Sequence, residues 1–392
     1  MPEPRPKSNR RRRVAILLGV ALLAFLVAKN PFFAIHRIAG VSMWPTYSGG
    51  EWIVVSKASR PPQRGEIVVL EPTDDGGTWL KRVVALGGER VLVSEGDLLV
   101  STGAVAEPVD PMRRTVAEII ESSAPIYDLA NLRSSADCLL DEHGLVRLRI
   151  EKGSVERSSD GAFLQLGKAG EQIVLRSPDR DFVDDRLDAT GAFAAGTRIV
   201  RDLILTVGIY GNAAGVLRIE HWVNGGPLEV FRLDFRPDGI AVQVNGADAG
   251  RVVLARPGAA SNQFLRCLMC DRRLVVETKD GVDAKADFSR LWEGPRPALP
   301  EATGSYLKLV VESGSVILSR LEVRRDIHYT RDHGEARFAI SSPLSVLDGN
   351  IFVLGDNSAE SEDGRRWGDL HPDRIVGRPV FVLWPPARLG RR

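Results

Sequence analysis

The chain has 392 residues, of which 44% are hydrophobic and 26% are charged. This length exceeds that of one ordinary domain, so two or more domains are expected, and the composition is that of a globular protein. The formal net charge of +1 excludes a chain-wide electrostatic field for nucleic acid. Positive charge is nevertheless concentrated at the N-terminus, in Lys7 and in the arginine run 10–13.

The first element in chain order is the uncharged apolar segment 14–28. It is short for a bilayer core, which takes about 20 apolar residues, but apolar character resumes at residues 31–35. A cleaved signal peptide would need small residues at an A-x-A-like site, and the sequence after Ala28 offers a poor one. A buried core helix would not begin with four arginines. The sequence therefore predicts a single transmembrane anchor at 14–28 that follows a cytoplasmic tail at 1–13.

Short strands and turns are expected after the anchor. Apolar, β-branched runs lie at residues 51–55, 65–70 and 79–85, and paired glycines or prolines separate them. The next stretch is less periodic, and it predicts a short helix near residues 116–120.

The residue pattern changes between about residues 140 and 330, where strand-like runs alternate with Asn-Gly and Asp-Gly turns. The predicted strands lie at 197–210, 216–222, 228–235, 240–244, 306–312 and 316–323. This pattern is typical of an all-β sandwich. The sequence thus predicts a mainly β protein in which a domain split between 36–107 and 336–386 is interrupted by an inserted β-sandwich at 108–335.

The chain has three cysteines, which cannot all pair with one another. Cys267 and Cys270 form a lone C-x-x-C motif, and no second pair or histidine cluster accompanies it as a zinc site would require. Two readings stay open: buried cysteines in a strand, or a local disulfide, which a location outside the cytoplasm permits. No metal site is predicted.

Two short segments carry residue types suited to acyl-transfer chemistry. In the first, Gly40 stands two residues before Ser42, and Pro45 sets a bend that can present a hydroxyl and a backbone N–H to a cleft. In isolation, an ordinary turn serine is the simpler interpretation. In the second, Lys81 and Arg82 stand in an apolar run and point to opposite faces of a strand. A lysine on the buried face loses solvation, which lowers its pKa and frees a base, whereas an exposed lysine keeps its charge.

Two further segments accompany them. Residues 64–69 form a turn that feeds a buried strand, which indicates structure rather than chemistry. Residues 355–368 follow the apolar strand 351–354 and are dense in hydrogen-bonding groups. In isolation this last segment is a solvated turn.

Taken in chain order, the segments resemble the motif set of the type I signal peptidases, which are membrane-anchored serine–lysine endopeptidases. The family patterns S-M-x-P-T, R-G-D-[IV]-V, K-R-[VI] and G-D-N-x-x-x-S-x-D-S-R-x-x-G match residues 42–46, 64–68, 81–83 and 355–368. The apolar segment stands just upstream, as in that family. The resemblance covers roughly residues 10–100 and 345–386, well under half of the chain.

The resemblance implies a role for each motif residue. Ser42 would be the nucleophile and Lys81 the general base, with Ser361 orienting the lysine. Asp363 and Arg365 would brace the site as an ion pair. The oxyanion hole would use the backbone N–H of Ser42.

This sequence departs from the family pattern at several positions. Some members add a serine hydroxyl to the oxyanion hole at the position of Gly40, where this chain has none. Glu66 replaces the usual aspartate, Glu89 follows Gly88 where Gly-Asp is usual, and Gly364 replaces a serine, which is expected to loosen the bracing loop. None of these changes removes the serine–lysine dyad.

The family also implies substrate, partners and location. Preprotein signal peptides would bind extended, and small pockets lined by Ile38, Met43 and Trp79 would select alanine before the cut. The enzyme would be a single-pass protein of the cell (inner) membrane, in contact with the lipid bilayer, with its N-terminus in the cytoplasm and its catalytic domain outside. It would need no cofactor and would bind no nucleic acid.

The inserted segment is similar in its strand pattern to concanavalin-A-like sandwiches, but no sugar-binding constellation stands out, so any ligand is unknown. His221 and His328 are expected to be structural. Because no catalytic motif lies inside, we expect a short linker in place of residues 110–333 to leave cleavage of a simple peptide intact.

Two other functions compete with signal-peptide cleavage. The same dyad serves self-cleaving repressors and conjugation-pilin peptidases, so a serine–lysine peptidase with a different dedicated substrate is one alternative. Repressors of this type lack an anchor and carry a DNA-binding helix-turn-helix, which does not fit this chain. The other alternative is a non-catalytic membrane-tethered binding protein, against which the intact Ser42 and Lys81 argue.

Overall fold

The computed structural model describes most of the chain after residue 30. The described residues are 31–391 without 72–76, 95, 103–111, 113, 129–132, 136–137, 141–146, 153, 159–160, 167–169, 171, 176–185, 195, 197, 199, 210–213, 224–225, 237–238, 254–262, 271–272, 280–284, 288–304, 332–337, 339 and 341. The predicted tail at 1–13 and anchor at 14–28 lie outside them. None of the helices in the described part is long and apolar enough to cross a membrane.

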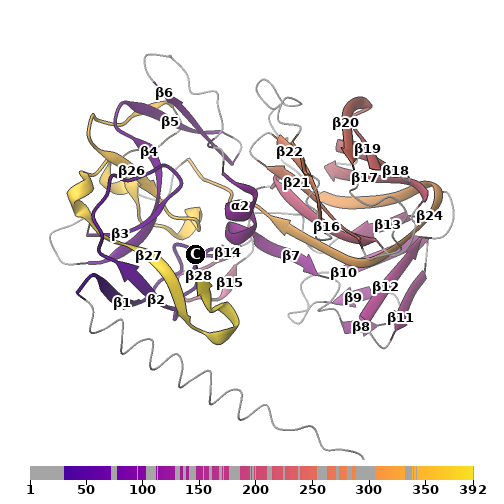
Figure 1. Cartoon of the computed structure of the whole chain (residues 1–392), viewed down its shortest axis with the longest axis horizontal. Coiled ribbons are helices and arrows are strands. Elements are labelled where there is room, and N and C mark those ends of the chain that lie inside the picture. Colours follow the sequence, from indigo (N-terminus) through magenta and orange to yellow (C-terminus); the bar gives the residue numbers. More distant parts are fainter. Residues whose placement is uncertain are drawn as a thin grey trace, which may run out of the picture.

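The protein is mainly β, as the sequence predicts, and it has two lobes (Figure 1). We call residues 31–102 and 338–391 the motif lobe, because they hold all the motif segments. Its main sheet has the order β1-β2-β27-β3-β4-β26, with β28 on β27. The strands are β1 (Phe33–Arg37), β2 (Trp52–Ser56), β3 (Ile67–Leu70), β4 (Trp79–Leu86), β26 (Ile351–Leu354), β27 (Ile375–Trp384) and β28 (Gly390–Arg391).

A smaller sheet completes the motif lobe. It consists of β25 (Leu344–Ser345), β5 (Glu89–Ser94) and β6 (Asp97–Thr102), in that order. Buried and half-buried side chains alternate along β5, so one face of this strand packs on the core and the other meets solvent. Short helical turns follow the last motif: 3-10 helix η3 (Ser358–Glu360), α3 (Gly364–Trp367), η4 (Pro372–Arg374) and η5 (Pro386–Arg388).

Strand β4 is the centre of the site, and its two edges are paired unequally. On one side β3 pairs with it antiparallel along residues 79–82. On the other side β26 pairs only with residues 82–86. Among the described strands none occupies the second edge at residues 79–81, so a length of β4 backbone beside Lys81 is left without a strand partner.

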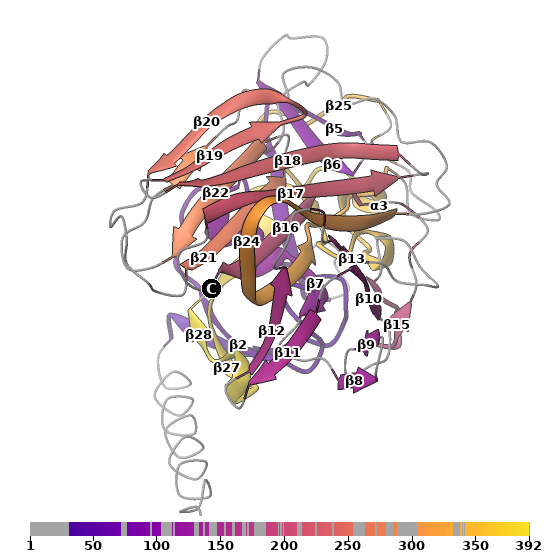
Figure 2. The ribbon, with the colours of Figure 1, turned by 90° about the vertical axis from the view of Figure 1, so that its right-hand side faces the viewer.

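The insert lobe, residues 124–325, is built on one extended sheet system (Figure 2). Among the described residues it contains β7 (Ala124–Asp128), β8 (Arg133–Ser135), β9 (Cys138–Leu140), β10 (Arg147–Lys152), β11 (Ser154–Ser158), β12 (Gly161–Leu166), β13 (Gln172–Leu175), β16 (Leu203–Ile209), β17 (Ala214–Val223), β18 (Gly226–Arg236), β19 (Gly239–Val244), β20 (Ala247–Val253), β21 (Gln263–Cys270), β22 (Arg273–Lys279), β23 (Lys285–Asp287) and β24 (Ser305–Arg325). A separate small hairpin pairs β14 (Arg186–Leu187) with β15 (Phe193–Ala194).

The long strand β24 joins the two parts of this sheet system. Its first half pairs with β17 and β13, and its second half pairs with β16, β12 and β7. The sequence predicts two strands here, and that prediction is wrong. The register to β17 slips between Val311 and Ser313, where Glu312 has no partner, and Gly314 two residues later adopts a left-handed conformation with φ of 72°. The extra residue Glu312 is therefore a bulge, and the strand continues through Gly314 instead of ending there.

The predicted short helix is confirmed as α2 (Val116–Ser122), which lies between the lobes in Figure 1. Thr115 starts it with a capping box, in which its side chain accepts from the Glu118 N–H and the Glu118 carboxylate accepts from the Thr115 N–H. Ile119 is fully buried against Ile204 and Leu268 of the insert lobe. This helix thus anchors the chain where it leaves the motif lobe.

Both ends of the insert pack into the motif lobe. Met112, Ile327 and Tyr329 are buried in the same hydrophobic cluster as Val84 and Phe352. Met112, Ile327 and Tyr329 lie within the predicted insert bounds 108–335 but belong to the core of the motif lobe. The inserted lobe is therefore shorter at both ends than the sequence predicts. Burial of these side chains stabilises the junction by roughly 1.5–3 kcal/mol per large residue.

The two described cysteines are buried and are not bonded to each other. Cys267 and Cys270 lie three residues apart on β21, so their side chains leave opposite faces of the strand. Burial raises the pKa of the Cys267 thiol to about 12, which keeps it protonated. Of the two readings that the sequence leaves open, buried strand cysteines hold for this pair. His221, on β17, is also fully buried.

Candidate active site

The nucleophile candidate Ser42 lies in a tight turn between β1 and β2. Two backbone hydrogen bonds close the turn, from Trp44 N to Val41 O at 2.9 Å and from Tyr47 N to Met43 O at 2.8 Å. Buried Met43 and Tyr47 pack beneath it, so the turn is fixed by its own bonds and by the core, and its serine is left half-buried at the surface of the lobe.

Lys81 reaches Ser42 from the buried face of β4. Its Nζ donates to Ser42 Oγ at 2.8 Å and to Ser361 Oγ at 3.1 Å. The lysine is 0% exposed. Burial lowers its pKa from 10.5 to about 8, although the nearby charge of Asp363 acts in the opposite direction. The ring of Trp79, two residues earlier on the same face, lies with its centroid 5.4 Å from Nζ. A substantial fraction of the amine is therefore neutral near pH 8 and can accept a proton.

Arg82 points to the other face of β4, as strand alternation requires. Its guanidinium binds Asp356 in a bidentate pair, with Nε to Oδ1 at 2.8 Å and Nη2 to Oδ2 at 2.6 Å. The hydroxyl of Thr46, in the nucleophile turn, also donates to Asp356. Arg82 thus links the turn to the 355–361 loop, and its neighbour Lys81 is left as the base candidate.

The loop 355–361 lies directly against the nucleophile turn. Asn357 N donates to Ser42 O at 2.9 Å. A Cβ added at Gly355 would come within 2.1 Å of Ser361 Oγ and 2.6 Å of Ser42 O, so only glycine fits there. The close approach explains why a glycine opens this motif.

A buried ion pair braces the same loop. Asp363 Oδ1 accepts from Arg365 Nε at 2.9 Å, and its Oδ2 accepts from Arg365 Nη2 at 2.8 Å and from Gly355 N at 3.0 Å. Burial alone would raise the pKa of Asp363, but the charge and hydrogen bonds of Arg365 outweigh it and hold the pKa below its usual range. Both side chains are almost fully buried. The carboxylate therefore stays ionised beside Lys81.

Arg365 also binds a residue that the sequence reading does not single out. Its Nη1 donates to Thr330 Oγ1 at 2.7 Å and to Ser358 Oγ at 3.1 Å. Thr330 lies just past the end of β24, inside the predicted insert. A linker in place of residues 110–333 would remove this acceptor, which makes loss of activity the expected result of that deletion rather than the intact cleavage predicted above.

The positions that depart from the family pattern are well packed. Glu66 accepts from Arg378 Nε at 2.7 Å, and Glu89 accepts from Leu86 N at 2.8 Å. A Cβ at Gly364 would lie 2.7 Å from Val353 O and 2.9 Å from the Phe352 ring. Phe352 therefore fills the space that a serine would need, and the bracing loop is tightly packed at this position. Gly40 has no atom within 4 Å of an added Cβ.

The three residues predicted to line substrate pockets lie on two sides of β4. Ile38 and Met43 belong to one hydrophobic cluster, in which Met43 is buried and Ile38 partly buried. Trp79 packs in another cluster and makes an edge-on contact with Trp367, with ring centroids 5.5 Å apart. Their part in substrate binding stays a prediction.

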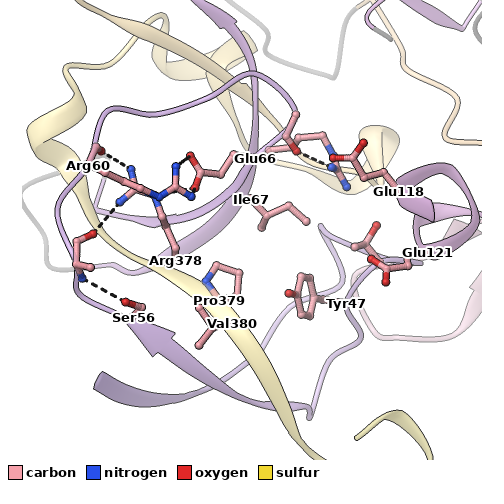
Figure 3. A pocket seen from close by; sticks show the side chains of 14 residues that line it. Tyr47, Ser56, Arg60, Glu66, Ile67, Glu118, Glu121, Arg378, Pro379 and Val380 are labelled. Carbon is pink, nitrogen blue, oxygen red and sulfur yellow. Dashed lines mark hydrogen bonds and ion pairs between the residues drawn. The ribbon is translucent and has the colours of Figure 1, made fainter. Parts of the chain in front are cut away.

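A cavity of about 390 Å³ lies on the Arg82 side of β4 (Figure 3). The motif lobe contributes Tyr47, Ile67 and Arg378 to its wall, and helix α2 contributes Glu118 and Glu121. Neither Ser42 nor Lys81 lines it. The cavity therefore lies between the motif lobe and helix α2, apart from Ser42 and Lys81.

One group of possible metal donors lies away from the dyad. Oxygen atoms of Asp202 and Asp326 and the sulfur of Cys270 all lie within 4.8 Å of one another, and all three residues are buried. The Arg114 guanidinium already forms a buried ion pair with Asp326. A cation there would face that guanidinium, so we assign no metal to the group.

Comparison with known proteins bears on the motif lobe. The family model described as signal peptidase, peptidase S26, matches residues 11–140 and 310–384, about half of the chain. Thylakoidal processing peptidase 1, chloroplastic, of Arabidopsis thaliana is 49% identical over 48 residues, which are 12% of this chain and 14% of that protein. Signal peptidase I U of Bacillus subtilis (strain 168) is 28% identical over 107 residues, 26% of this chain and 57% of that protein. The chain thus spans less than two thirds of the length of either relative.

Solved structures match about half of the chain at low similarity. Lectin I-B4 from Griffonia simplicifolia, in its metal-free form, matches 50% of this chain and 97% of its own with 13% identity and a TM-score of 0.30. The exoplasmic/lumenal domain of VIP36 in its Ca²⁺/Man3GlcNAc-bound form matches 55% and 99% with 13% identity and a TM-score of 0.29. Scores this low establish nothing about a ligand of the insert lobe.

Proposed function

Because the chain belongs to the S26 family of signal peptidases, we propose that it is a membrane-bound serine endopeptidase that cleaves N-terminal signal peptides from exported preproteins. The observation that carries the proposal is the 2.8 Å contact between Lys81 Nζ and Ser42 Oγ, with the lysine fully buried. A serine hydroxyl is a weak nucleophile until a base takes its proton. A neutral lysine amine at hydrogen-bonding distance supplies that base.

The reaction follows from this geometry. Lys81 takes the proton of Ser42 Oγ as the oxygen attacks the scissile carbonyl, and it returns the proton to the leaving amine. Ser361 Oγ, 3.1 Å from Nζ, fixes the direction of the amine. No described residue accepts a backbone hydrogen bond from Ser42 N, so this N–H is available to the oxyanion. Water then releases the acyl group by the same base.

The substrate is proposed to bind as an added strand. The second edge of β4 at residues 79–81 has no strand partner among the described residues, and it lies beside the dyad. An extended peptide can pair there through its backbone, which places side chains alternately up and down. Ile38, Met43 and Trp79 are proposed to shape the small pockets that select alanine near the cut.

The location is part of the same proposal. The apolar segment 14–28 would hold the chain in the cell membrane as a single span, with arginines 10–13 in the cytoplasm and both lobes outside. Ser42 then lies about a dozen residues beyond the membrane, where the cleavage site of a membrane-inserted signal peptide emerges.

Cleavage of a preprotein by the full-length chain tests the proposal. The chain is reconstituted in lipid vesicles with a preprotein that has an Ala-X-Ala cleavage site, and the N-terminus of the product is sequenced. We expect one cut directly after that site, and none with Ser42→Ala. A wild-type chain that leaves the preprotein whole, or a Ser42→Ala chain that still cuts it, contradicts the proposal.

A further inference from the structure

The small hairpin β14–β15 belongs to the inserted segment, yet it contacts the site loop of the motif lobe. Leu187 O on β14 accepts a hydrogen bond from Asn357 Nδ2 at 2.8 Å. The neighbouring Arg186 Nε binds Glu360 Oε1 at 3.1 Å. Figure 1 shows the hairpin beside the motif lobe and apart from the large sheet. It also lies outside the two stretches that the family model matches, 11–140 and 310–384.

Asn357 is the point at which three segments meet. Its backbone N–H donates to Ser42 O at 2.9 Å, and its side-chain amide donates both to Val41 O at 3.2 Å and to Leu187 O. The residue is 4% exposed. The two N–H groups of the Asn357 side chain thus connect the nucleophile turn and the hairpin. Loss of either acceptor would leave a buried N–H without a hydrogen bond, which costs free energy.

The hairpin is built to hold this position. Asp188 Oδ1 accepts from Thr190 N at 2.9 Å, from Thr190 Oγ1 at 2.6 Å and from Ala192 N at 3.0 Å. Gly191 supplies the left-handed turn residue, with φ of 82°. This local network fixes the turn without help from the large sheet, so the carbonyl of Leu187 is presented to Asn357 in a defined direction.

A second insert contact reaches the same turn from the other end of the insert. The guanidinium carbon of Arg325, the last residue of β24, lies 5.6 Å from the centre of the Trp44 ring. Trp44 is two residues after Ser42. The insert lobe therefore touches the nucleophile turn directly through Arg325 and indirectly through Asn357.

We propose that the β14–β15 hairpin is a positioning element of the active site, which holds Asn357, and through it the Ser42 turn and the 355–361 loop, in the arrangement that closes over Lys81. This inference rests on the proposed peptidase function. The hairpin does not touch the reacting atoms. It acts by fixing the distance between the Ser42 turn and the 355–361 loop, which are joined by the hydrogen bond from Asn357 N to Ser42 O.

The position of the hairpin has a measurable consequence for the base. Lys81 owes its lowered pKa first to burial. If the 355–361 loop loosens, water reaches the amine and the pKa returns toward 10.5, its ordinary value. The rising limb of the pH profile of kcat/KM then moves to higher pH. A general loss of stability would lower the melting temperature without moving this limb.

A double-mutant cycle on the full-length chain tests the proposal. One variant has a Gly-Ser linker of equal length in place of residues 186–194, the second has Asn357→Ala, and the third has both changes. With a fluorogenic Ala-X-Ala peptide, each single variant is expected to lower kcat about tenfold at nearly constant KM, and the double variant to be no worse than either. The rising limb should move to higher pH in all three. The proposal is overturned if the kcat losses of the two single variants multiply in the double variant and the rising limb of the pH profile stays in place.

A matched pair of arginines controls for surface charge. Arg186→Ala removes the hairpin's ion pair to Glu360, and Arg366→Ala removes an ion pair of the same length, 3.1 Å, to Glu362 within the segment 355–368. We expect only Arg186→Ala to lower kcat. Equal effects of the two variants contradict a specific role for the hairpin.

Hydrogen exchange gives a reading that does not depend on activity. The Asn357 amide donates to Ser42 O, so its exchange rate reports whether loop and turn stay joined. We expect faster exchange at residues 355–361 in the linker variant, and exchange like the wild type in Arg366→Ala. Unchanged exchange in the linker variant overturns the inference even if the peptide is not cut. A wild-type chain that cannot cut the peptide contradicts the proposed function. The hydrogen-exchange comparison then still decides whether the hairpin holds the 355–361 loop.

Discussion

Lys81 Nζ lies 2.8 Å from Ser42 Oγ, although the two residues are 39 positions apart and stand on different strands or turns. Side chains alternate between the two faces of β4, which puts Lys81 and Arg82 on opposite faces, and the turn after β1 meets the Lys81 face. Among the described residues, the lysine amine forms hydrogen bonds to two serine hydroxyls and to no carboxylate or imidazole. Burial is thus the largest influence on the pKa of Lys81, and it outweighs the opposing charge of Asp363.

Replacement of Gly40 by serine is expected to raise kcat/KM. An added Cβ at Gly40 meets no atom within 4 Å, so the side chain fits, and its hydroxyl is two residues before Ser42. Removal of one oxyanion donor typically costs an enzyme about 10²–10³ in kcat, and we expect a new, less constrained donor to return about tenfold. Gly40→Ala is the control, since it adds the same Cβ without a hydroxyl. Equal rates for the two variants on a signal-peptide substrate would show that no donor is missing.

Asp363→Asn is expected to change both the pH profile and the stability. The Asp363 charge raises the pKa of Lys81, so its removal lowers that pKa further, and the rising limb of kcat/KM moves to lower pH. The change also leaves the buried Arg365 without its anion, which destabilises the fold by about 3–5 kcal/mol. Glu362→Gln, at the neighbouring half-buried carboxylate, is the control for stability. A limb that moved to higher pH would contradict the assignment of the limb to Lys81.

Lys81→Met is expected to stabilise the protein in a pH-dependent way. The folded-state pKa of about 8 lies below the unfolded value of ~10.4, so the unfolded chain binds the proton more tightly between these values. The contribution of Lys81 to the unfolding free energy therefore rises with pH across that interval, and below it the burial of the charge costs about 3 kcal/mol.

Urea unfolding at pH 7 and pH 10 measures this effect. The advantage of Lys81→Met over the wild type should be large at pH 7 and smaller at pH 10. Lys81→Arg is the control, because a guanidinium keeps its proton at both pH values, so its difference from Lys81→Met should stay constant. An advantage of the methionine variant that did not change with pH would show that Lys81 titrates normally in the fold.

Much of the motif lobe could be predicted from local sequence. The apolar runs at 51–55, 65–70 and 79–85 coincide with β2, β3 and β4, because β-branched residues bounded by glycine and proline favour strands. Strand alternation alone predicts that Lys81 and Arg82 point to opposite faces, but it cannot say which of them meets Ser42. That choice depends on Asp356, which binds Arg82 from 274 residues away.

The role of the insert could not be predicted in the same way. Leu187 contacts Asn357 through a backbone carbonyl, which carries no residue-specific signal in a sequence. Thr330 is one of many threonines until Arg365 is seen to bind it. Gly314 lies inside one continuous strand, two residues after the bulge at Glu312, although a glycine between two apolar runs normally indicates a turn. Each of these features depends on contacts between residues distant in the chain, so the sequence pattern alone favours an independent inserted domain.

The pH dependence of cleavage in Lys81 variants tests the serine–lysine assignment most directly. For the wild-type chain, kcat/KM on a signal-peptide substrate should rise through a pKa of about 8, since only the neutral amine accepts the Ser42 proton. Lys81→Ala and Lys81→Arg should both abolish cleavage, as should Ser42→Ala. A histidine base would instead give a rise near ~6.5. A Lys81→Ala enzyme that still cuts its substrate with the wild-type pH profile would contradict the assignment.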